Sequence, residues 1–278
     1  MKRELKIATE AARKAGDIIL RYYRSDYAVL DKSRTGRMPT LRRRGAAAKN
    51  PVTTADHASN DRLKEILLSE FPDYGWLSEE TVDSRERLTK ERVWVVDPLD
   101  GTKEFIEGVP NFVVSVALVE NHHPIVGVLF NPVTGELFAS AQGQGATLNG
   151  DPIRCSSQSD PGGMEILMSR TESRNGLWRK FENRFRKLKS VGSVSYKLGL
   201  TAAGRGDVFA SLRPKNEWDV CGGHCLVAEA GGIMVSLRGE PVTYNNPKTR
   251  IPFGLVAGNP EAVNATLNIL TGGKVPHA

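Results

Sequence analysis

The sequence contains little cysteine and no long apolar run, and each shortage excludes a class of protein. Its three cysteines, Cys155, Cys221 and Cys225, are an odd number without the spacing of a disulfide framework, and the first residues lack the apolar core of a secretion signal. We therefore expect a cytoplasmic protein. The longest apolar stretch, near Val113–Val119, is far shorter than the roughly 20 residues of a membrane helix, so we expect no membrane association.

Acidic residues are outnumbered, and the 38 Lys and Arg against 32 Asp and Glu give a formal net charge of +6. Most of the excess falls in an Arg-rich segment at residues 32–49. The sequence has no helix-turn-helix, zinc-finger or RNA-binding aromatic signature, so we do not expect nucleic acid as the partner. Three interpretations of this segment stay open: a solvated surface loop, a guide for the phosphate groups of a small substrate, and a nucleic-acid contact.

The first half of the chain alternates two helical patterns with several strands. Apolar residues at spacings of three and four predict a helix from Leu5 to Tyr22, and a second helix is predicted from about residue 50 to Ser69. The strands that follow are predicted at Trp76–Glu80, Arg92–Asp97, Phe112–Glu120, Pro124–Phe130 and Glu136–Ala141, the last two as a hairpin.

Beyond about residue 150 the pattern changes to short strands that alternate with helices, which favours an α/β second half. Helices are predicted near 174–186, 195–203 and 220–230, and the first of these places Trp178, Phe181 and Phe185 on one face, where we expect core packing. We therefore expect an N-terminal α+β domain at 1–150 with most of the candidate metal ligands. A C-terminal α/β domain at 151–278 is expected to carry Asp219 and the substrate contacts.

A short apolar strand ends in two carboxylates three positions apart, Asp97 and Asp100. Pro98 fixes one backbone angle between them, and Gly101 tolerates conformations that other residues avoid. Both acids and the Leu99 carbonyl can therefore point toward one place. We expect that place to hold a hard cation.

Two further acidic positions, Glu79 and Asp219, also lie at the ends of predicted elements. Each could simply cap a helix, and Asp219 precedes a Gly-rich helix where a cap is common. Taken together with Asp97 and Asp100, they favour a site where divalent ions relieve the repulsion between carboxylates. With oxygen ligands and no histidine or cysteine in these motifs, Mg²⁺ or Mn²⁺ fits better than Zn²⁺.

Gly192, Ser193 and Lys197 lie at the start of a predicted helix, where hydroxyls, amides and an ammonium group could receive a substrate phosphate. An ordinary capped helix explains the same residues equally well. Both interpretations stay open.

The chain resembles the magnesium-dependent, lithium-sensitive phosphatases related to inositol monophosphatase, over almost its whole length. Four ordered motifs carry the resemblance: Val52–Asp56, Ser78–Glu80, Trp94–Thr102, and Trp218–Asp219 followed by Ala228–Gly232. Within that family, Lys103–Phe105 and Glu217 look like the 3'(2'),5'-bisphosphate nucleotidases. The segment Phe209–Pro214 also lacks the acid that inositol enzymes place there.

The resemblance implies a layered α/β fold, an α/β/α/β sandwich, with the metal cluster between its halves. It implies one Mg²⁺ at Glu79, Asp97 and the Leu99 carbonyl, and a second at Asp97, Asp100 and Asp219. Glu79 is also implied to reach a weaker third ion and is expected to be catalytic. Leu99, Asp100 and Asp219 are implied to help bind the substrate as well.

The resemblance further implies that Thr102, hydrogen-bonded to Asp56, orients a water for in-line attack, while the amides of Gly101 and Thr102 bind phosphate oxygens. The implied reaction is hydrolysis of adenosine 3',5'-bisphosphate to AMP and phosphate by a homodimer. Inositol monophosphate and fructose 1,6-bisphosphate are the alternative substrates. A phosphate- or nucleic-acid-binding module without turnover is the alternative of another class.

Overall fold

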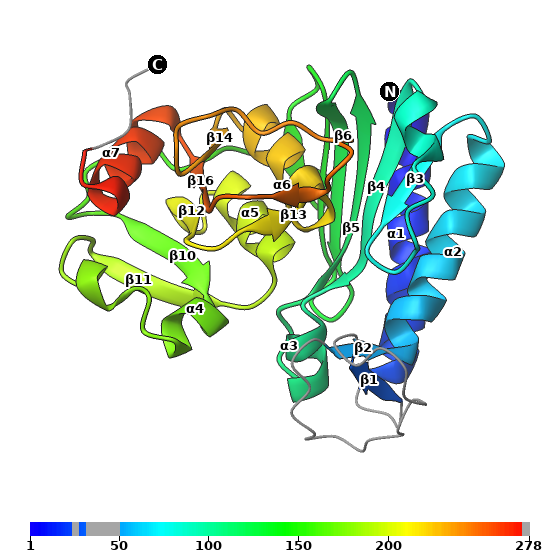
Figure 1. Ribbon diagram of the computed structural model, residues 1–278, viewed down its shortest axis with the longest axis horizontal. Helices are drawn as coiled ribbons and strands as arrows, with labels where there is room; N and C mark the ends of the chain where they lie inside the picture. The colour runs from blue at the N-terminus through cyan, green and yellow to red at the C-terminus, as the bar shows by residue number, and fades with distance from the viewer. Residues whose placement is uncertain (24–27, 32–50, 274–278) are drawn as a thin grey trace.

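Seven strands form one sheet in the order β3-β4-β5-β6-β7-β8-β9, in a computed structural model that describes residues 1–23, 28–31 and 51–273 (Figure 1). The strands are β3 (Gly75–Ser78), β4 (Arg92–Asp100), β5 (Val113–Glu120), β6 (His123–Asn131), β7 (Glu136–Ala141), β8 (Ala146–Leu148) and β9 (Asp151–Ile153). Only the β3–β4 pair is parallel among them. Because side chains alternate along a strand, Trp94 and Val96 of β4 join the core on one face while Val93 and Val95 join the core on the other.

Helices cover both faces of this sheet. The outer face carries α1 (Lys2–Tyr22) and α2 (Thr54–Glu70), whose small and apolar residues pack on β4, β5 and β6. The inner face carries α5 (Val194–Ala202) and α6 (Glu217–Glu229), which also contact a second sheet. None of the helices in the described part of the chain has the length and apolarity that a bilayer span requires.

The second sheet has five strands in the order β11-β10-β12-β16-β14, and α7 (Pro260–Thr271) packs on its outer face. Its strands are β10 (Glu165–Ser169), β11 (Lys187–Val191), β12 (Val208–Ser211), β14 (Ile233–Ser236) and β16 (Leu255–Gly258). The smaller elements are β1 (Val29–Asp31), β2 (Pro51–Thr53), η1 (Glu86–Thr89), α3 (Thr102–Glu107), β13 (Lys215–Asn216) and β15 (Arg250–Ile251). The α/β/α/β layering is confirmed.

The predicted helix at 174–186 is wrong. The chain there forms the short helix α4 (Arg170–Arg174) and a single 3-10 turn, η2 (Arg179–Phe181). Trp178, Phe181 and Phe185 are nevertheless buried against the second sheet, as expected. Their spacing satisfies packing on a sheet without a continuous helix.

One apolar core runs through both halves of the chain. It contains Leu77 and Val95 of the first sheet together with Leu226 of α6 and Leu255 of the second sheet. Helix α6 lies directly on β6 at Gly127, where a Cβ atom would come within 2.4 Å of the Gly222 carbonyl oxygen. The first sheet ends at 153 and the second begins at 165, so the boundary near 150 separates sheets that share a core. That they are two domains stays a prediction.

A buried polar clamp also ties the two halves together. Arg87 of η1, 2% exposed, donates to Asp83, to the Asn245 side chain and to the Asn246 carbonyl. The two asparagines in turn donate their backbone N–H groups to the Glu217 carboxylate at the start of α6. Glu217 therefore anchors a loop, and this anchoring accounts for its position without any substrate.

Replacing Arg87 with alanine is expected to lower the free energy of unfolding by about 3 kcal/mol, because it leaves buried partners unpaired. Urea denaturation measures the change. Arg62→Ala is the control, since it breaks an exposed pair with Glu65 and should cost less than about 0.5 kcal/mol. Equal, small losses in both variants would show that the clamp contributes nothing.

Candidate active site

The acidic motif at the end of β4 lies on a bulge. Asp97 pairs with Ser115 and Asp100 with Val113, so β4 holds one residue more than β5 across this interval. The strand was predicted to end at 97, but it continues through the bulge to Asp100. Gly101 then has φ 105°, and a Cβ atom there would lie 2.9 Å from the Asn111 carbonyl oxygen, so the tight turn into α3 requires glycine.

Three carboxylates meet beside this bulge. One oxygen each from Glu79, Asp97 and Asp219 lies within 4.8 Å of the other two. Glu79 follows β3, whose last residue pairs in parallel with Val96, and Asp219 lies in the first turn of α6. Residues separated by 140 positions are thus brought to one place, and the expected cluster of these three acids is present.

The like charges of this cluster repel one another. Burial raises the pKa of Asp97 well above its usual range, and repulsion from Glu79, Asp100 and Asp219 raises it further. Burial and repulsion from Glu79 and Asp100 raise the pKa of Asp219 to about 8. An all-oxygen set of crowded carboxylates, one buried and two half-buried, fits a divalent cation of the Mg²⁺ type, which would compensate the charge.

Asp100 lies near these acids but is held from the other side. Its Oδ2 accepts hydrogen bonds from the Ser193 hydroxyl at 2.6 Å and the Ser195 backbone N–H at 2.5 Å. The carboxylate thereby links β4 to the start of α5. Its role as a ligand of a second ion stays a prediction.

Thr102 and Asp56 form the expected pair. The Thr102 Oγ1 lies 3.0 Å from Asp56 Oδ1 and 3.2 Å from the carbonyl oxygen of Leu99, the predicted metal ligand. The other oxygen of Asp56 accepts from the Thr53 backbone N–H at 2.7 Å and so caps α2. Burial, chiefly, raises the pKa of Asp56 to about 7, which suits a proton acceptor near neutral pH.

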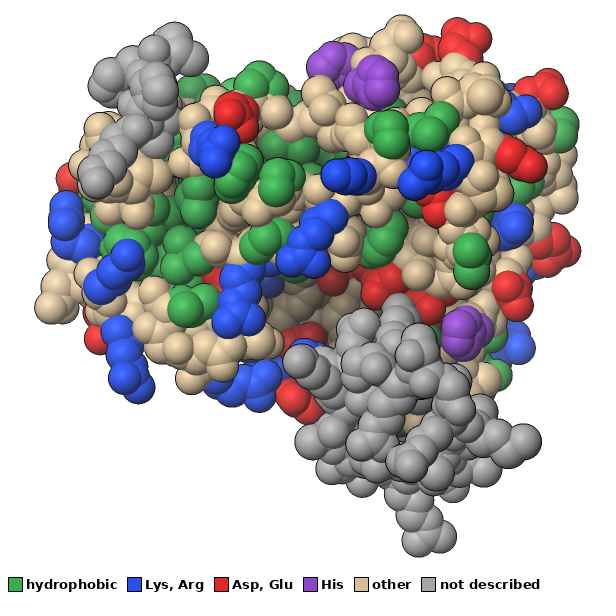
Figure 2. Space-filling model, viewed as in Figure 1, with side chains coloured by type: hydrophobic (Ala, Val, Ile, Leu, Met, Phe, Trp, Pro, Cys, Tyr) green, Lys and Arg blue, Asp and Glu red, His purple; other side chains and the backbone are tan. Residues whose placement is uncertain are grey.

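These residues open into a pocket of about 420 Å³ between the two halves, a volume typical of small-ligand sites. Figure 2 shows the hollow, with acidic side chains inside it and Lys and Arg side chains along one rim. The cations that line it are Lys103, Arg170, Lys197 and Lys215. Among them the sequence analysis proposed only Lys197 as a substrate contact.

Lys197 does not present a free ammonium group to the pocket. It is 2% exposed, and its Nζ donates to the carbonyl oxygens of Val191, at 3.1 Å, and Ser193. These contacts hold the loop that carries Gly192 and Ser193, both of which line the pocket as expected. A direct phosphate contact by Lys197 stays a prediction, and the observed contacts give it a structural role.

Arg170, which lines the pocket, and Glu172, which lies behind it, were missed by the sequence analysis, and Glu104 was named there only as part of a motif. Arg170 follows β10 and forms ion pairs with Glu104 at 2.9 Å and Glu107 at 2.5 Å, which joins the two halves across the pocket. The one available signal was the position of Arg170 directly after a strand. The Arg-rich segment at 32–49 lies outside the described residues.

The comparisons with known proteins agree with this geometry. The model of the inositol monophosphatase family matches residues 1–268. Inositol monophosphatase 3 of Solanum lycopersicum is 34% identical over 275 residues, 95% of this chain and 92% of its own. The Nus factor SuhB of Escherichia coli K12 is 34% identical over 273 residues, covering 95% and 94%. A solved IMPase of Thermotoga maritima superposes with a TM-score of 0.81 at 25% identity, covering 98% of each chain.

Replacing Asp97 with asparagine is expected to abolish stabilisation by metal. Saturating MgCl₂ or MnCl₂ should stabilise the unmodified protein by about 2.7 kcal/mol at a hundredfold excess over Kd, and the variant by much less. In EDTA the variant should be at least as stable as the unmodified protein, since one repelling charge is gone. Thermal unfolding measures both, with exposed Asp73→Asn as the control. Unchanged metal stabilisation in the Asp97 variant would contradict the site.

Proposed function

Because the chain belongs to the inositol monophosphatase family, a metal-dependent phosphatase family, we propose that it is a Mg²⁺-dependent phosphomonoesterase whose substrate is adenosine 3',5'-bisphosphate. The observation that carries the proposal is the meeting of Glu79, Asp97 and Asp219 beside the Thr102–Asp56 pair in one pocket.

Charge neutralisation accounts for most of the rate in this proposal. Hydrolysis of phosphate monoesters needs rate enhancements on the order of 10²¹, while a general base contributes about 10²–10⁴. Divalent ions, when bound by Glu79, Asp97 and Asp219, supply charge neutralisation at the phosphoryl oxygens and water activation. The Leu99 carbonyl and Asp100 complete the expected ligand set.

The chain's own residues orient the nucleophile. The Thr102 hydroxyl holds the attacking water in line with the leaving group, and Asp56 accepts the proton through Thr102. The capping contacts from Thr53 fix the Asp56 carboxylate, so that only its Oδ1 is left for Thr102. The amides of Gly101 and Thr102 bind oxygens of the transferred phosphate.

The charge of the rim supports a substrate with a second phosphate. Lys103, Arg170 and Lys215 line the pocket, and the segment Phe209–Pro214 contributes no carboxylate to it. Neutral ring hydroxyls of inositol gain little from such a rim, whereas a second phosphate finds cations there. Inositol monophosphate is the second candidate, because the name of the tomato relative states that activity for a protein 34% identical to this one.

Phosphate release from a substrate panel tests the proposal. With Mg²⁺ present, kcat/KM for adenosine 3',5'-bisphosphate should exceed that for inositol 1-phosphate and fructose 1,6-bisphosphate, and EDTA should remove all activity. Release of phosphate from inositol 1-phosphate with the highest kcat/KM would replace the substrate. Activity that persists in EDTA and does not change when Mg²⁺ is added would refute the metal assignment.

Thr102→Val is expected to lower kcat about 10²–10³-fold with little change in KM, because it removes the group that links water to Asp56. Thr102→Ser keeps the hydroxyl and should retain most of the rate. Steady-state kinetics on the preferred substrate separate kcat from KM. A loss of equal size in the serine variant would mean that the methyl group, and not the hydroxyl, is what matters.

A further inference from the structure

The four cations of the pocket differ in how firmly other groups hold them. Arg170 forms short ion pairs with two glutamates, and Lys197 is buried against backbone carbonyls. Lys103 lines the pocket and directly follows Thr102 in α3, the residue proposed to orient the water. These three therefore have a structural partner or a place next to the chemistry.

Lys215 is held loosely by comparison. Its Nζ lies 3.2 Å and 3.4 Å from the carbonyl oxygens of its own neighbours Arg213 and Pro214. The nearest carboxylate oxygen, from Glu172, is 3.7 Å away, beyond hydrogen-bonding distance. The Lys215 side chain is only 11% exposed, and it lines the pocket. It is an enclosed cation whose one carboxylate contact among the described residues is this long ion pair.

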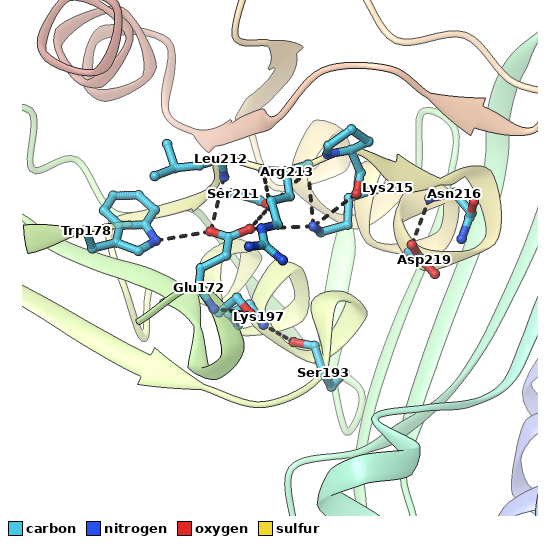
Figure 3. A network of polar contacts seen from close by, with 12 residues as sticks. Glu172, Trp178, Ser193, Lys197, Ser211, Leu212, Arg213, Lys215, Asn216 and Asp219 are labelled. Atoms are coloured by element: carbon cyan, nitrogen blue, oxygen red, sulfur yellow. Dashed lines mark hydrogen bonds and ion pairs between the residues drawn. The ribbon is translucent and has the colours of Figure 1, made fainter. Parts of the chain in front are cut away.

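Glu172 has a different set of partners. Its buried carboxylate accepts hydrogen bonds from the Trp178 indole at 3.0 Å, the Ser211 hydroxyl at 2.7 Å and the Leu212 backbone N–H at 3.1 Å. Figure 3 shows the Trp178 and Leu212 donors at one carboxylate oxygen, Oε2, and Ser211 and Lys215 at the other, Oε1. Three neutral donors already occupy Glu172, so it fixes the segment that leads to Lys215 and pairs with the ammonium group only at 3.7 Å.

We propose that Lys215 binds the second anionic group of the substrate and that Glu172 is the positioning residue that sets where Lys215 stands. This rests on the proposed function, which supplies a substrate with two phosphates. The reacting phosphate lies at the acidic cluster, and the second phosphate takes the N–H donor of Lys215 that its backbone carbonyls leave free. A charge-assisted hydrogen bond of this kind gives about 10- to 100-fold in affinity.

The test compares substrates that differ only in the second phosphate. Values of kcat/KM are measured for adenosine 3',5'-bisphosphate against adenosine 3'-phosphate, and for fructose 1,6-bisphosphate against fructose 1-phosphate. Lys215→Met should lower the preference for the bisphosphate by about 10- to 100-fold, mainly through KM. Lys189→Met removes the same charge outside the pocket and should change the preference by no more than about twofold.

The comparison of the nucleotide pair with the fructose pair separates this proposal from the function it rests on. Loss of preference on the sugar pair in an enzyme that leaves nucleotides intact supports Lys215 and refutes the nucleotide substrate. No preference for a second phosphate in the unmodified enzyme, or a preference that Lys215→Met does not change, overturns the proposal. An equal loss on monophosphates and bisphosphates also overturns it, since Lys215 would then act on the reacting phosphate.

Glu172→Gln tests the positioning role. It should raise KM for the bisphosphate with little change in kcat, and adding it to Lys215→Met should cause no further loss of preference. If the glutamine variant does not fold, Ser211→Ala removes one of the same contacts and should shift KM in the same direction. Additive effects in the double variant would show that Glu172 does not act through Lys215.

Discussion

Mutual repulsion among three crowded carboxylates, one buried and two half-buried, is the constraint on which this structure depends. Glu79, Asp97 and Asp219 gain nothing in folding stability from meeting, because burial and like charge both raise the pKa of Asp97. Their meeting has to be enforced by the layers around them. The parallel β3–β4 pair sets Glu79 beside Asp97, and the packing of α6 on β6 brings in Asp219. The shared apolar core offsets the electrostatic cost.

The acids reach their places partly by acting as helix caps. Asp56 and Asp219 each stand at the third position of a helix, where one oxygen accepts a backbone N–H from the residue before the helix. Asp100, from the end of β4, accepts the N–H of Ser195 in the first turn of α5 and so caps a helix to which it does not belong. A carboxylate has two oxygens, so the one that caps the helix fixes the direction of the other. Capping and site chemistry are therefore compatible uses of one side chain.

How local each interaction is along the chain decided what could be predicted from the sequence. The motif around Asp97 was recognisable because its turn chemistry is local, and the layered fold followed from strands and helices with strong periodicity. The helix at 174–186 was wrong because aromatic residues spaced to pack on a sheet imitate a helical face. The structural roles of Lys197 and Glu172 could not be predicted. Lys197 depends on backbone carbonyls, and Glu172 on hydrogen-bond donors, that only the folded chain brings near them.

The acidic cluster and the basic rim of the pocket also constrain how metal and substrate bind. Without a cation, Asp97 and Asp219 repel an approaching phosphate. A cation bound between these carboxylates attracts the phosphate instead. Metal and phosphate must then strengthen each other's binding by the same factor, because the coupling is reciprocal. The Lys and Arg side chains on the opposite rim do not depend on metal in this way. In the proposed function, Lys215 on that rim binds the remote charge of a substrate before a cation binds the acidic cluster, which gives the two sides of the pocket separate tasks.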